Sequence, residues 1–548
     1  MKPQIRRHMP LRHCLVLILL WSAISSALAA DFIYTVQPGD HLWNLAQRYL
    51  KAPALAIALR ERNHIPDDRR IAPGTRLRIP NEWLKLETAR VRVAAVVGDT
   101  RLVGGQTQSR SPDVGELLQA PVELQTGATG SVSLEFADGS RVLVRRDTRL
   151  QLRSAQQRVL GKVHMVELVL LQGSLENQVK SMTDTGGRFE IRAPAAVAAV
   201  RGTQFRVYAQ PDSLRTEVLE GAVNVSNTAG QVNASAAQGS LAQVGQVPSQ
   251  PVALLAAPVL TSLPERVERL PIDLPLPAVA GASGYRTQLA PGTQFLVAES
   301  DETSPAARIR ARNVEDGNYV LRVRAIDAQG LEGLSSERSL VVHARPEPPL
   351  LIEPAADSAT TAPQPSFRWT QADPSWRYRL QISKAGQNQP LEEQELAHTT
   401  GATAQQALPP GQYQWRMAAI HPQKGLGPWG DVQSFRRVLP GPGVDIPTPK
   451  DGNLPLRWSA QPQAAQYRLQ VDMDKTFVNP QTDAQTETAQ YALQGLPPGT
   501  HYVRVRAIGD DGYTGPWGST QSFVVPEPEP EPSHWRALLV LLPLLGLL

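Results

Sequence analysis

The spacing of hydrophobic residues changes once along the chain, near residue 89. Ahead of that point, Leu42, Leu45, Ala46 and Tyr49 stand three or four residues apart, which predicts the buried face of a helix. After it, apolar and polar residues alternate, as in the run from Ser131 to Phe136, and glycine-containing turns separate the alternating runs. A period of two is typical of β-strands with one buried face. The chain is therefore predicted to be a multidomain, mainly β protein with a small helical module at its front.

Residues 30–85 form the first predicted module. A strand-like run at 32–36 ends in the turn Gln37-Pro38-Gly39, and Asp40 is expected to cap the helix that follows. Pro53 suits the first turn of a second helix, and residues 76–80 alternate as a short closing strand. The predicted order is strand, helix, helix, strand.

This module resembles the LysM domain, a peptidoglycan-binding family. The resemblance rests on the run from Tyr34 to Ala46, on Asn63, and on the runs 71–74 and 79–80, although His41 stands where the family usually has Thr or Ser. It implies a groove for N-acetylglucosamine chains between two loops. The implicated residues are Gly39, Asp40, His41 and Leu42 on one loop, and Asn63, His64, Ile65 and Pro66 on the other. In the alternative interpretation, Asp40 only caps a helix and Leu42 only packs in the core.

Residues 89–230 form a second, all-β domain. The run from Ile191 to Phe205 resembles the hallmark of the FecR domain, and Gly98-Asp99, Asp138-Gly139-Ser140 and Glu220-Gly221 fall at that family's turns. Gln172-Gly173 is predicted to be a further turn. The resemblance implies a domain that docks on or senses an envelope protein.

Two details limit that resemblance. Members that regulate sigma factors carry a cytoplasmic segment and a membrane helix ahead of this domain, whereas a signal peptide and the LysM-like module precede it here, so sigma-factor regulation is not expected. Arg201 is a candidate anion contact, but a structural place in a turn before Gly202 suits it better.

Residues 231–258 are rich in Ala, Gln, Ser and Gly and are predicted to be a linker. Beyond them a segment recurs about every 89 residues, since Tyr378 matches Tyr467, Tyr413 matches Tyr502, and the sequence Gly-Pro-Trp-Gly occurs in both copies. The predicted units are a degenerate repeat at 259–346 and two fuller repeats at 347–440 and 441–525. They resemble fibronectin type III modules, in which strand Tyr and Trp residues are expected in the core. The alternating arginines at 503–506 are expected on a solvated face, and a spacer or protein-docking role is expected for the array.

Both ends of the chain carry distinctive segments. Residues 1–29 resemble a signal peptide, with a basic start, an apolar run and the cleavage pattern Ala27-Leu28-Ala29; an uncleaved anchor is the alternative. Residues 526–533 begin with a run of alternating Pro and Glu that ends at Pro532, which predicts a stiff spacer. Residues 534–548 form an apolar tail shorter than an ordinary membrane span. Three interpretations stay open for it: a membrane anchor, a tail that docks on a partner, or a truncated reading frame.

Composition narrows the chemistry. The chain has 55 Lys and Arg against 51 Asp and Glu, a balance that gives no footprint for nucleic acid. The single cysteine, Cys14, lies in the predicted signal peptide, so thiol chemistry is not expected in the mature chain. No nucleophile elbow, phosphate-binding glycine loop or zinc-binding histidine pair occurs. We therefore expect no enzyme activity, no cofactor and no metal site.

The expected function is that of a non-catalytic cell-envelope protein, exported to the periplasm, that binds peptidoglycan or another N-acetylglucosamine polymer. Its FecR-like domain is expected to dock on or sense an unidentified envelope protein, and its tail to contact a membrane. Two alternatives stay open: an envelope signalling or surface-attachment protein in which the LysM-like module only localises the chain, and a murein hydrolase.

Overall fold

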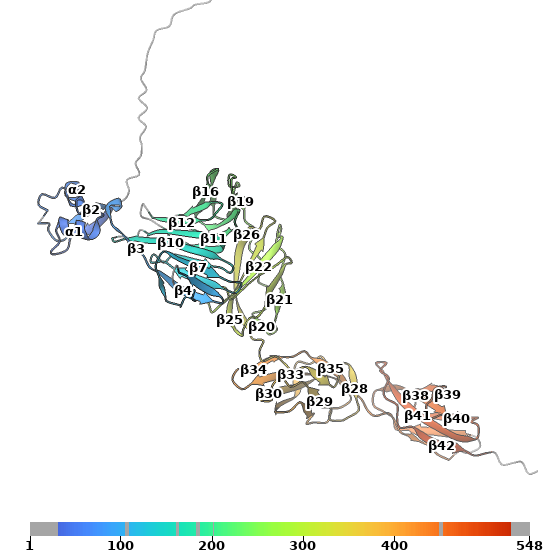
Figure 1. Cartoon of the computed structure of the whole chain (residues 1–548). Helices are drawn as coiled ribbons and strands as arrows, with labels where there is room; N and C mark the ends of the chain where they lie inside the picture. Colours follow the sequence, from blue (N-terminus) through green and yellow to red (C-terminus); the bar gives the residue numbers. More distant parts are fainter. Residues whose placement is uncertain are drawn as a thin grey trace, which may run out of the picture. The chain divides into compact units, whose positions relative to one another are not determined.

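The computed structural model describes residues 31–527, except 69, 105–108, 161–163, 182–186, 201 and 449–452. The described chain is mainly β, with two α-helices close to its N-terminal end (Figure 1), which confirms the predicted fold class. It divides into two compact units, Met1–His343 and Ala344–Leu548. The predicted signal peptide, Arg201, the apolar tail and all but the first two residues of the Pro/Glu spacer lie outside the described residues.

The first unit begins with a βααβ module, as predicted. Its elements are β1 (Asp31–Thr35), α1 (Leu42–Tyr49), α2 (Leu55–Arg62) and β2 (Arg76–Pro80), followed by the 3-10 turn η1 (Asn81–Trp83). β1 and β2 pair antiparallel. Leu42, Leu45 and Leu77 belong to a small core of their own and are at most 1% exposed. The leucines of α1 that stand at helical spacing in the sequence therefore face the core, as predicted.

A β domain of 17 strands follows. Its strands are β3 (Leu86–Thr88), β4 (Val91–Val97), β5 (Thr100–Val103), β6 (Leu117–Leu118), β7 (Val122–Thr126), β8 (Ser131–Glu135), β9 (Arg141–Val144), β10 (Arg149–Arg158), β11 (His164–Gln178), β12 (Arg188–Arg192), β13 (Val197–Val200), β14 (Gln204–Ala209), β15 (Ser213–Glu220), β16 (Ala222–Asn227), β17 (Gly230–Ser235), β18 (Gln238–Gln243) and β19 (Val252–Ala253). The alternating apolar residues of these strands form one core, which runs from Ala89 to Ala242.

The long strand β11 joins two layers of this domain. It pairs with β10 as far as Gln172 and with β14 from Gly173 onward. Gly173 has a φ of +95°, and a Cβ at this position would lie 2.3 Å from Oγ1 of Thr148. The predicted turn at Gln172-Gly173 is therefore wrong: the glycine bends a continuous strand from one layer into the other. The other three predicted turns are confirmed, each between consecutive strands.

The predicted linker at 231–258 is also wrong. Strands β17, β18 and β19 fall within it, and Val232, Ala234 and Ala242 lie in the domain core. Small residues pack in this part of the sheet because neighbouring side chains approach closely: a Cβ on Gly239 would lie 3.0 Å from the side chains of Leu254 and Leu331. Small residues thus mark a closely packed edge here rather than a flexible connection.

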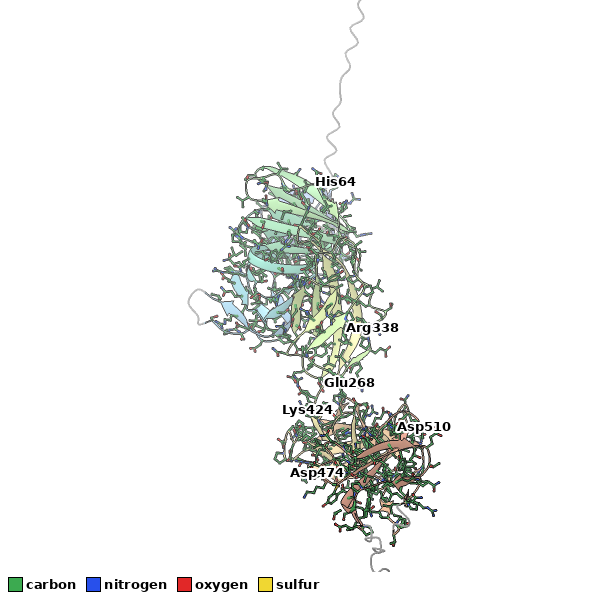
Figure 2. All side chains as sticks on the ribbon, turned by 90° about the vertical axis from the view of Figure 1, so that its right-hand side faces the viewer. His64, Glu268, Arg338, Lys424, Asp474 and Asp510 are labelled. Atoms are coloured by element: carbon green, nitrogen blue, oxygen red, sulfur yellow. The ribbon has the colours of Figure 1, made fainter. Side chains whose placement is uncertain are left out.

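The first sandwich repeat completes the first unit. Its strands are β20 (Arg266–Val267), β21 (Ile272–Pro275), β22 (Gly284–Pro291), β23 (Ser300–Ser304), β24 (Arg308–Ala311), β25 (Gly317–Ile326) and β26 (Glu332–Val342). Five of them form a sheet in the order β20-β26-β25-β22-β23, and β21 pairs with β24. Arg338 on β26, labelled in Figure 2, donates to the carbonyl oxygen of Leu260 at 2.7 Å and so ties the segment before β20 to the sheet.

The second unit contains the other two repeats. The second repeat comprises β27 (Leu351–Glu353), β28 (Ser358–Thr360), β29 (Ser366–Trp369), β30 (Arg377–Lys384), β31 (Pro390–Ala397), β32 (Gly401–Thr403), β33 (Gly411–His421), β34 (Gly425–Trp429) and β35 (Gln433–Arg437). The third comprises β36 (Val444–Asp445), β37 (Asn453–Trp458), β38 (Ala464–Asp472), β39 (Thr482–Thr486), β40 (Gln490–Gln494), β41 (Gly499–Gly509) and β42 (Gln521–Val525). Each repeat pairs a three-stranded sheet with a larger one. Trp369, Tyr378 and Trp458 lie in the two cores, as predicted.

Equivalent hydrogen bonds show that the three repeats are copies of one fold. The hydroxyls of Tyr285, Tyr378 and Tyr467 each accept a hydrogen bond from the backbone N–H six residues upstream. A second set of side chains, each on the strand that pairs with the first, bonds to the carbonyl oxygen four residues upstream: Tyr319, Tyr413 and His501. The predicted match of Tyr413 with Tyr502 is therefore wrong, because His501 occupies this position in the third repeat.

Candidate functional site

Asp40 holds the loop between β1 and α1. Its carboxylate accepts hydrogen bonds from the backbone N–H of Gln37 and from the hydroxyl of Tyr34, both at 2.8 Å. Burial and the nearby Asp40 carboxylate raise the pKa of Tyr34, which keeps its hydroxyl a donor. Gly39, at the tip of the loop, has a φ of +90° and open space where a Cβ would stand. The result is a tight turn whose backbone is exposed.

His41, and not Asp40, caps helix α1. Its backbone is extended, and its Nδ1 accepts from the N–H of Asn44 at 3.4 Å. The predicted cap at Asp40 is wrong because that carboxylate already accepts from the turn before it. His41 thereby takes the place that Ser or Thr usually has at such a helix start.

The second loop begins where α2 ends in a left-handed residue. The N–H of Ile65 donates to the carbonyl oxygen of Arg60 at 3.0 Å, and the N–H of His64 donates to that of Glu61 at 3.2 Å. His64 has a φ of +52°. Together these are the bonds and the backbone of a Schellman motif, in which Gly is the usual left-handed residue. The His64 side chain projects from the end of the helix as a result and is exposed.

Asn63 fixes this loop to the closing strand. Its side-chain Nδ2 donates to the carbonyl oxygens of Leu59 and Arg78, at 2.9 and 3.0 Å, and its Oδ1 accepts from the N–H of Arg78 at 2.6 Å. The amide therefore imitates a strand partner for β2. All of these bonds are internal to the module, so the Asn63 side chain acts in positioning.

The two predicted loops do come together. The backbone N–H of Leu42 donates to the carbonyl oxygen of Asp68 at 3.2 Å, which joins the start of α1 to the loop after α2. The predicted site residues differ in what they expose: Gly39, His64 and Pro66 are exposed, Asp40, His41, Asn63 and Ile65 are half-buried, and Leu42 is buried. Trp43, in the first turn of α1, is 54% exposed. It was not singled out from the sequence, although its place off the buried helical stripe was a signal.

A second polar cluster, which we call the ionic junction, joins the β domain to the first repeat. Its members from the β domain are Arg145, Glu176, Arg206 and Glu217, and those from the repeat are Arg286, Asp301, Arg322, Arg324 and Glu332. The side chains of Arg145, Arg206 and Arg324 are at most 5% exposed. Five arginines and four carboxylates thus lie together between two domains that were predicted to be separated by a linker.

The junction pairs every charge across short distances. Arg145 reaches Asp301 at 3.0 Å and Glu332 at 3.1 Å, and Glu176 receives both Arg322 and Arg324 at 2.8 Å. Burial raises the pKa of the Glu176 carboxyl, but Arg324 and Arg322 outweigh it and hold that pKa well below its usual range. The Glu176 carboxylate therefore stays ionised. The first repeat is consequently docked on the β domain and is not a free spacer.

Backbone groups complete the junction. The N–H of Glu332 donates to Glu217 at 2.7 Å, and Arg206 donates to the carbonyl oxygens of Glu332 and Gly333, at 2.5 and 2.8 Å. Burial lowers the pKa of Arg206 and raises that of Glu217, although these two also bond to each other at 2.7 Å. Sequence reasoning missed this cluster because arginines in alternating strands are usually solvated.

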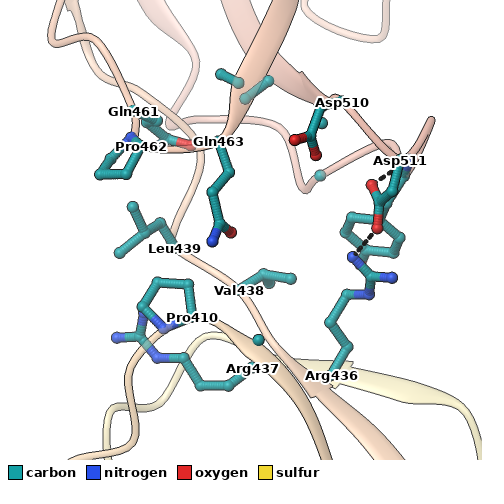
Figure 3. Close-up of a pocket in the computed structure, with 16 residues that line it drawn as sticks. Pro410, Arg436, Arg437, Val438, Leu439, Gln461, Pro462, Gln463, Asp510 and Asp511 are labelled. Carbon is teal, nitrogen blue, oxygen red and sulfur yellow. Dashed lines mark hydrogen bonds and ion pairs between the residues drawn. The ribbon is translucent and has the colours of Figure 1, made fainter.

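A small cavity lies where the second and third repeats meet (Figure 3). Its volume is about 90 Å³, and its lining includes Arg436, Gln463 and Asp511. Arg436 donates to Asp511 at 2.6 Å, and its guanidinium carbon lies 4.4 Å from the centre of the Tyr513 ring. These charges already pair with each other, so the cavity is best described as a joint between repeats that has room for water.

Within the described ranges, no cluster of His, Cys, Asp and Glu is arranged to hold a metal ion. The same residues include no helix with the length and apolar character needed to cross a membrane.

Comparison with known families assigns two of the domains. Residues 34–80 match the LysM domain, and residues 122–224 match the family described as FecR protein. The chain thus contains a LysM domain followed by a FecR domain, as the resemblances predicted. Both are binding or signalling domains typical of cell-envelope proteins: LysM is associated with N-acetylglucosamine polymers and FecR with protein interaction. The comparison with curated proteins gave no match.

Several solved structures are similar to parts of the chain. The FN1–FN3 domains of chicken CNTN1 are 15% identical over 46% of this chain and 94% of that one, with a TM-score of 0.18. A two-domain fibronectin type III segment of chicken tenascin is 15% identical over 33% and 99%, with a TM-score of 0.23. A putative anti-sigma factor from Parabacteroides distasonis is 18% identical over 24% of this chain, with a TM-score of 0.20, and the match spans 57% of that protein.

Proposed function

We propose that this chain is a non-catalytic protein of the cell envelope that binds the N-acetylglucosamine chains of peptidoglycan through residues 31–85. One observation carries the proposal: the hydrogen bond from Leu42 to Asp68 brings the two predicted loops side by side while their tips stay exposed. A groove between two such loops suits an extended polymer, because the polymer chain can lie along the groove and continue beyond it on both sides.

Each side of the groove has its own role in this proposal. Near Gly39, exposed backbone groups read the acetamide of the sugar, because a glycine at that position lets the ligand approach closely. His64, Pro66 and the exposed ring of Trp43 supply a side-chain wall for the sugar faces. Leu42 and Asn63 hold the groove in shape from beneath.

The remaining domains carry the interaction with protein. The FecR domain docks on or senses an envelope protein, and the sandwich repeats extend the chain beyond it. Export by residues 1–29 and a membrane contact through residues 534–548 complete the proposal. Both segments fit the envelope location that is typical of LysM and FecR domains.

Titration of the whole chain with N,N′,N″-triacetylchitotriose tests the glycan site. His64→Gly removes the imidazole and leaves a residue that accepts a φ of +52°. We expect it to weaken binding by about two- to tenfold, the value of one side-chain hydrogen bond. Lys51→Ala, an exposed position at the other end of α1, is the matched control and should bind as the unmodified chain does. Equal affinities for both variants would remove His64 from the site.

An alternative function is signalling in the envelope, with the LysM domain only localising the chain. The ionic junction supports this alternative, because one layer of the FecR domain already contacts another β domain of the same chain. If the chitotriose titration shows no binding while the protein is folded, this alternative takes first place.

A further inference from the structure

The three sandwich repeats share a polar relay on the outer face of the larger sheet. A carboxylate accepts from a glutamine amide, and in the second and third repeats the same glutamine accepts from an arginine on the next strand. The three relays are Asp301, Gln288 and Arg322; Glu393, Gln381 and Arg416; and Asp483, Gln470 and Arg504. The Arg416 and Arg504 bonds have the same length, 2.9 Å. In all three repeats the glutamine and the arginine stand directly opposite each other in the strand register.

An aromatic ring covers this arginine in two of the repeats. The guanidinium carbon of Arg322 lies 3.4 Å from the centre of the Phe295 ring, and that of Arg504 lies 4.2 Å from the Phe477 ring. Both phenylalanines come from the loop that follows the glutamine strand, at 292–299 and 473–481. Phe477 keeps a left-handed backbone, with a φ of +52°, and is only 5% exposed. A bulky residue adopts that conformation only where its surroundings hold it.

The second repeat lacks this ring. Its corresponding loop, 385–389, is shorter and contains no aromatic residue. A cavity of about 230 Å³ lies there, and its lining includes Gln381, Gln387, Asn388, Gln414 and Arg416. Arg416 still stacks on the ring of Trp429, 4.6 Å away, as Arg504 does on Trp517. The relay and the tryptophan are thus retained, while the covering ring is missing.

The same face already binds protein elsewhere in this chain. In the first repeat, Arg322 of the relay pairs with Glu176 of the FecR domain, and Asp301 pairs with Arg145. The relay face is therefore suited to contact with another protein surface. In the second repeat this face presents side-chain amides, which can both donate and accept hydrogen bonds, around the guanidinium of Arg416, which has no covering phenylalanine.

We propose that this cavity of the second repeat is a docking site for a partner protein, which inserts an aromatic side chain onto Arg416. The ring takes the place that Phe477 has in the third repeat. The amide of Gln387 and the side-chain oxygen of Gln414, whose Nε2 already donates to the carbonyl oxygen of Gln387, bond to the backbone on either side of it. The partner is recognised by an exposed Phe, Tyr or Trp in an extended segment. This site is separate from the glycan groove of the LysM domain.

The test uses the whole chain and two blocked tripeptides, N-acetyl-Gly-Phe-Gly-amide and N-acetyl-Gly-Leu-Gly-amide, in saturation-transfer NMR titrations. We expect the Phe peptide to bind about tenfold more tightly than the Leu peptide, since only the aromatic ring attracts a guanidinium. Arg416→Gln should remove that preference. Arg377→Gln, on the neighbouring strand and outside the cavity lining, pairs with Glu395 rather than with the relay, so it is the matched control and should keep the preference.

Two further variants keep the proposal falsifiable if Arg416→Gln misfolds. Asn388→Phe supplies a covering ring from the loop of the second repeat and should weaken binding of the Phe peptide at least tenfold. Phe477→Ala uncovers Arg504 and should raise the number of peptide sites from one to two. Equal binding of both peptides, or binding that Asn388→Phe leaves intact, overturns the proposal. Chitotriose binding that Asn388→Phe abolishes would also overturn it, because the cavity would then be a glycan site.

Discussion

Asn63 shows how one side chain can hold the loop after α2 to the closing strand of the LysM domain. Its amide makes three hydrogen bonds, two of them to the backbone of Arg78 on β2. We expect Asn63→Ala to lower the stability of the LysM domain by about 1–3 kcal/mol, because the backbone groups at Arg78 lose their partners. Hydrogen exchange of the Arg78 amide in the whole chain measures this change.

A matched variant separates that effect from a general loss of polarity. Asn44→Ala changes the same residue type at an exposed position of α1 and should alter exchange in β2 by less than about 0.5 kcal/mol. If both variants leave the Arg78 amide equally protected, Asn63 does not hold the strand.

His501 occupies a position that tyrosine holds in the other two repeats. Its Nε2 bonds to the carbonyl oxygen of Pro497 at 2.8 Å, but its buried Nδ1 has no hydrogen-bond partner. We expect His501→Tyr to stabilise the third repeat by about 1 kcal/mol, because the hydroxyl can serve Pro497 and no buried nitrogen remains unpaired. Urea unfolding monitored by the hydrogen exchange of β41 is the measurement. A destabilised variant would mean that the larger ring does not fit against Phe523.

At this scale, the sequence located residues better than it assigned their roles. Gly39 and His64 lie at exposed loop positions. The cap at His41 and the clamp at Asn63 could not be predicted, because each depends on which neighbouring group already has a partner. That information exists only once the chain is folded.

At the scale of elements, the alternating pattern predicted strands but not their partners. The apolar residues of the β domain are buried as expected, whereas β17 and β18 were read as linker because they are rich in small residues. Arginines at alternate positions were read as solvated. In the first repeat they are buried against carboxylates of another domain, and in the third Arg504 and Arg506 stack on Trp517. Local pattern does not reveal which surface a strand will face.

Glu332 is the element-level test of the ionic junction. It accepts hydrogen bonds from Arg145, Arg286 and Arg324, at 2.6 to 3.1 Å. We expect Glu332→Gln to lower the unfolding free energy of the first unit by about 3–5 kcal/mol, because three arginines, two of them buried, lose a shared counter-charge. Glu337→Gln removes a carboxylate whose side chain is 44% exposed and should cost less than about 1 kcal/mol. Equal urea midpoints for the two variants would contradict the role of the junction.

At the scale of the whole molecule, the junction should make the first unit acid-labile. Burial alone would raise the pKa values of Glu176, Asp301 and Glu332. The attraction of their arginine partners is larger than this effect, so the pKa values of all three carboxyls lie below normal. Such groups stabilise the fold above their unfolded pKa, about 4, and that stability is lost as the pH falls through the folded values. Glu217, whose burial raises its pKa, acts in the opposite direction, and the three lowered groups outweigh it.

We therefore expect the urea midpoint of the first unit to fall between pH 5 and pH 3. Glu332→Gln should reduce this fall, because one of the three carboxylates no longer titrates. A midpoint that is independent of pH over this range would contradict the predicted pKa directions.

The architecture joins a LysM domain to a FecR domain and three β-sandwich repeats. Family resemblance predicted the order of the domains from the sequence, because the LysM and FecR patterns are local. The docking of the first repeat on the FecR domain was not predictable, since its charges are far apart in the sequence and none carries a motif.

Co-sedimentation with purified peptidoglycan sacculi tests the central claim most directly. The chain from residue 31 to residue 533 is compared with one that lacks residues 31–85, whose core is separate from that of the β domain. We expect only the longer chain to pellet with the sacculi, and chitotriose to release it. Pelleting of both chains would place the wall contact outside the LysM domain, and pelleting of neither would contradict peptidoglycan binding by this protein.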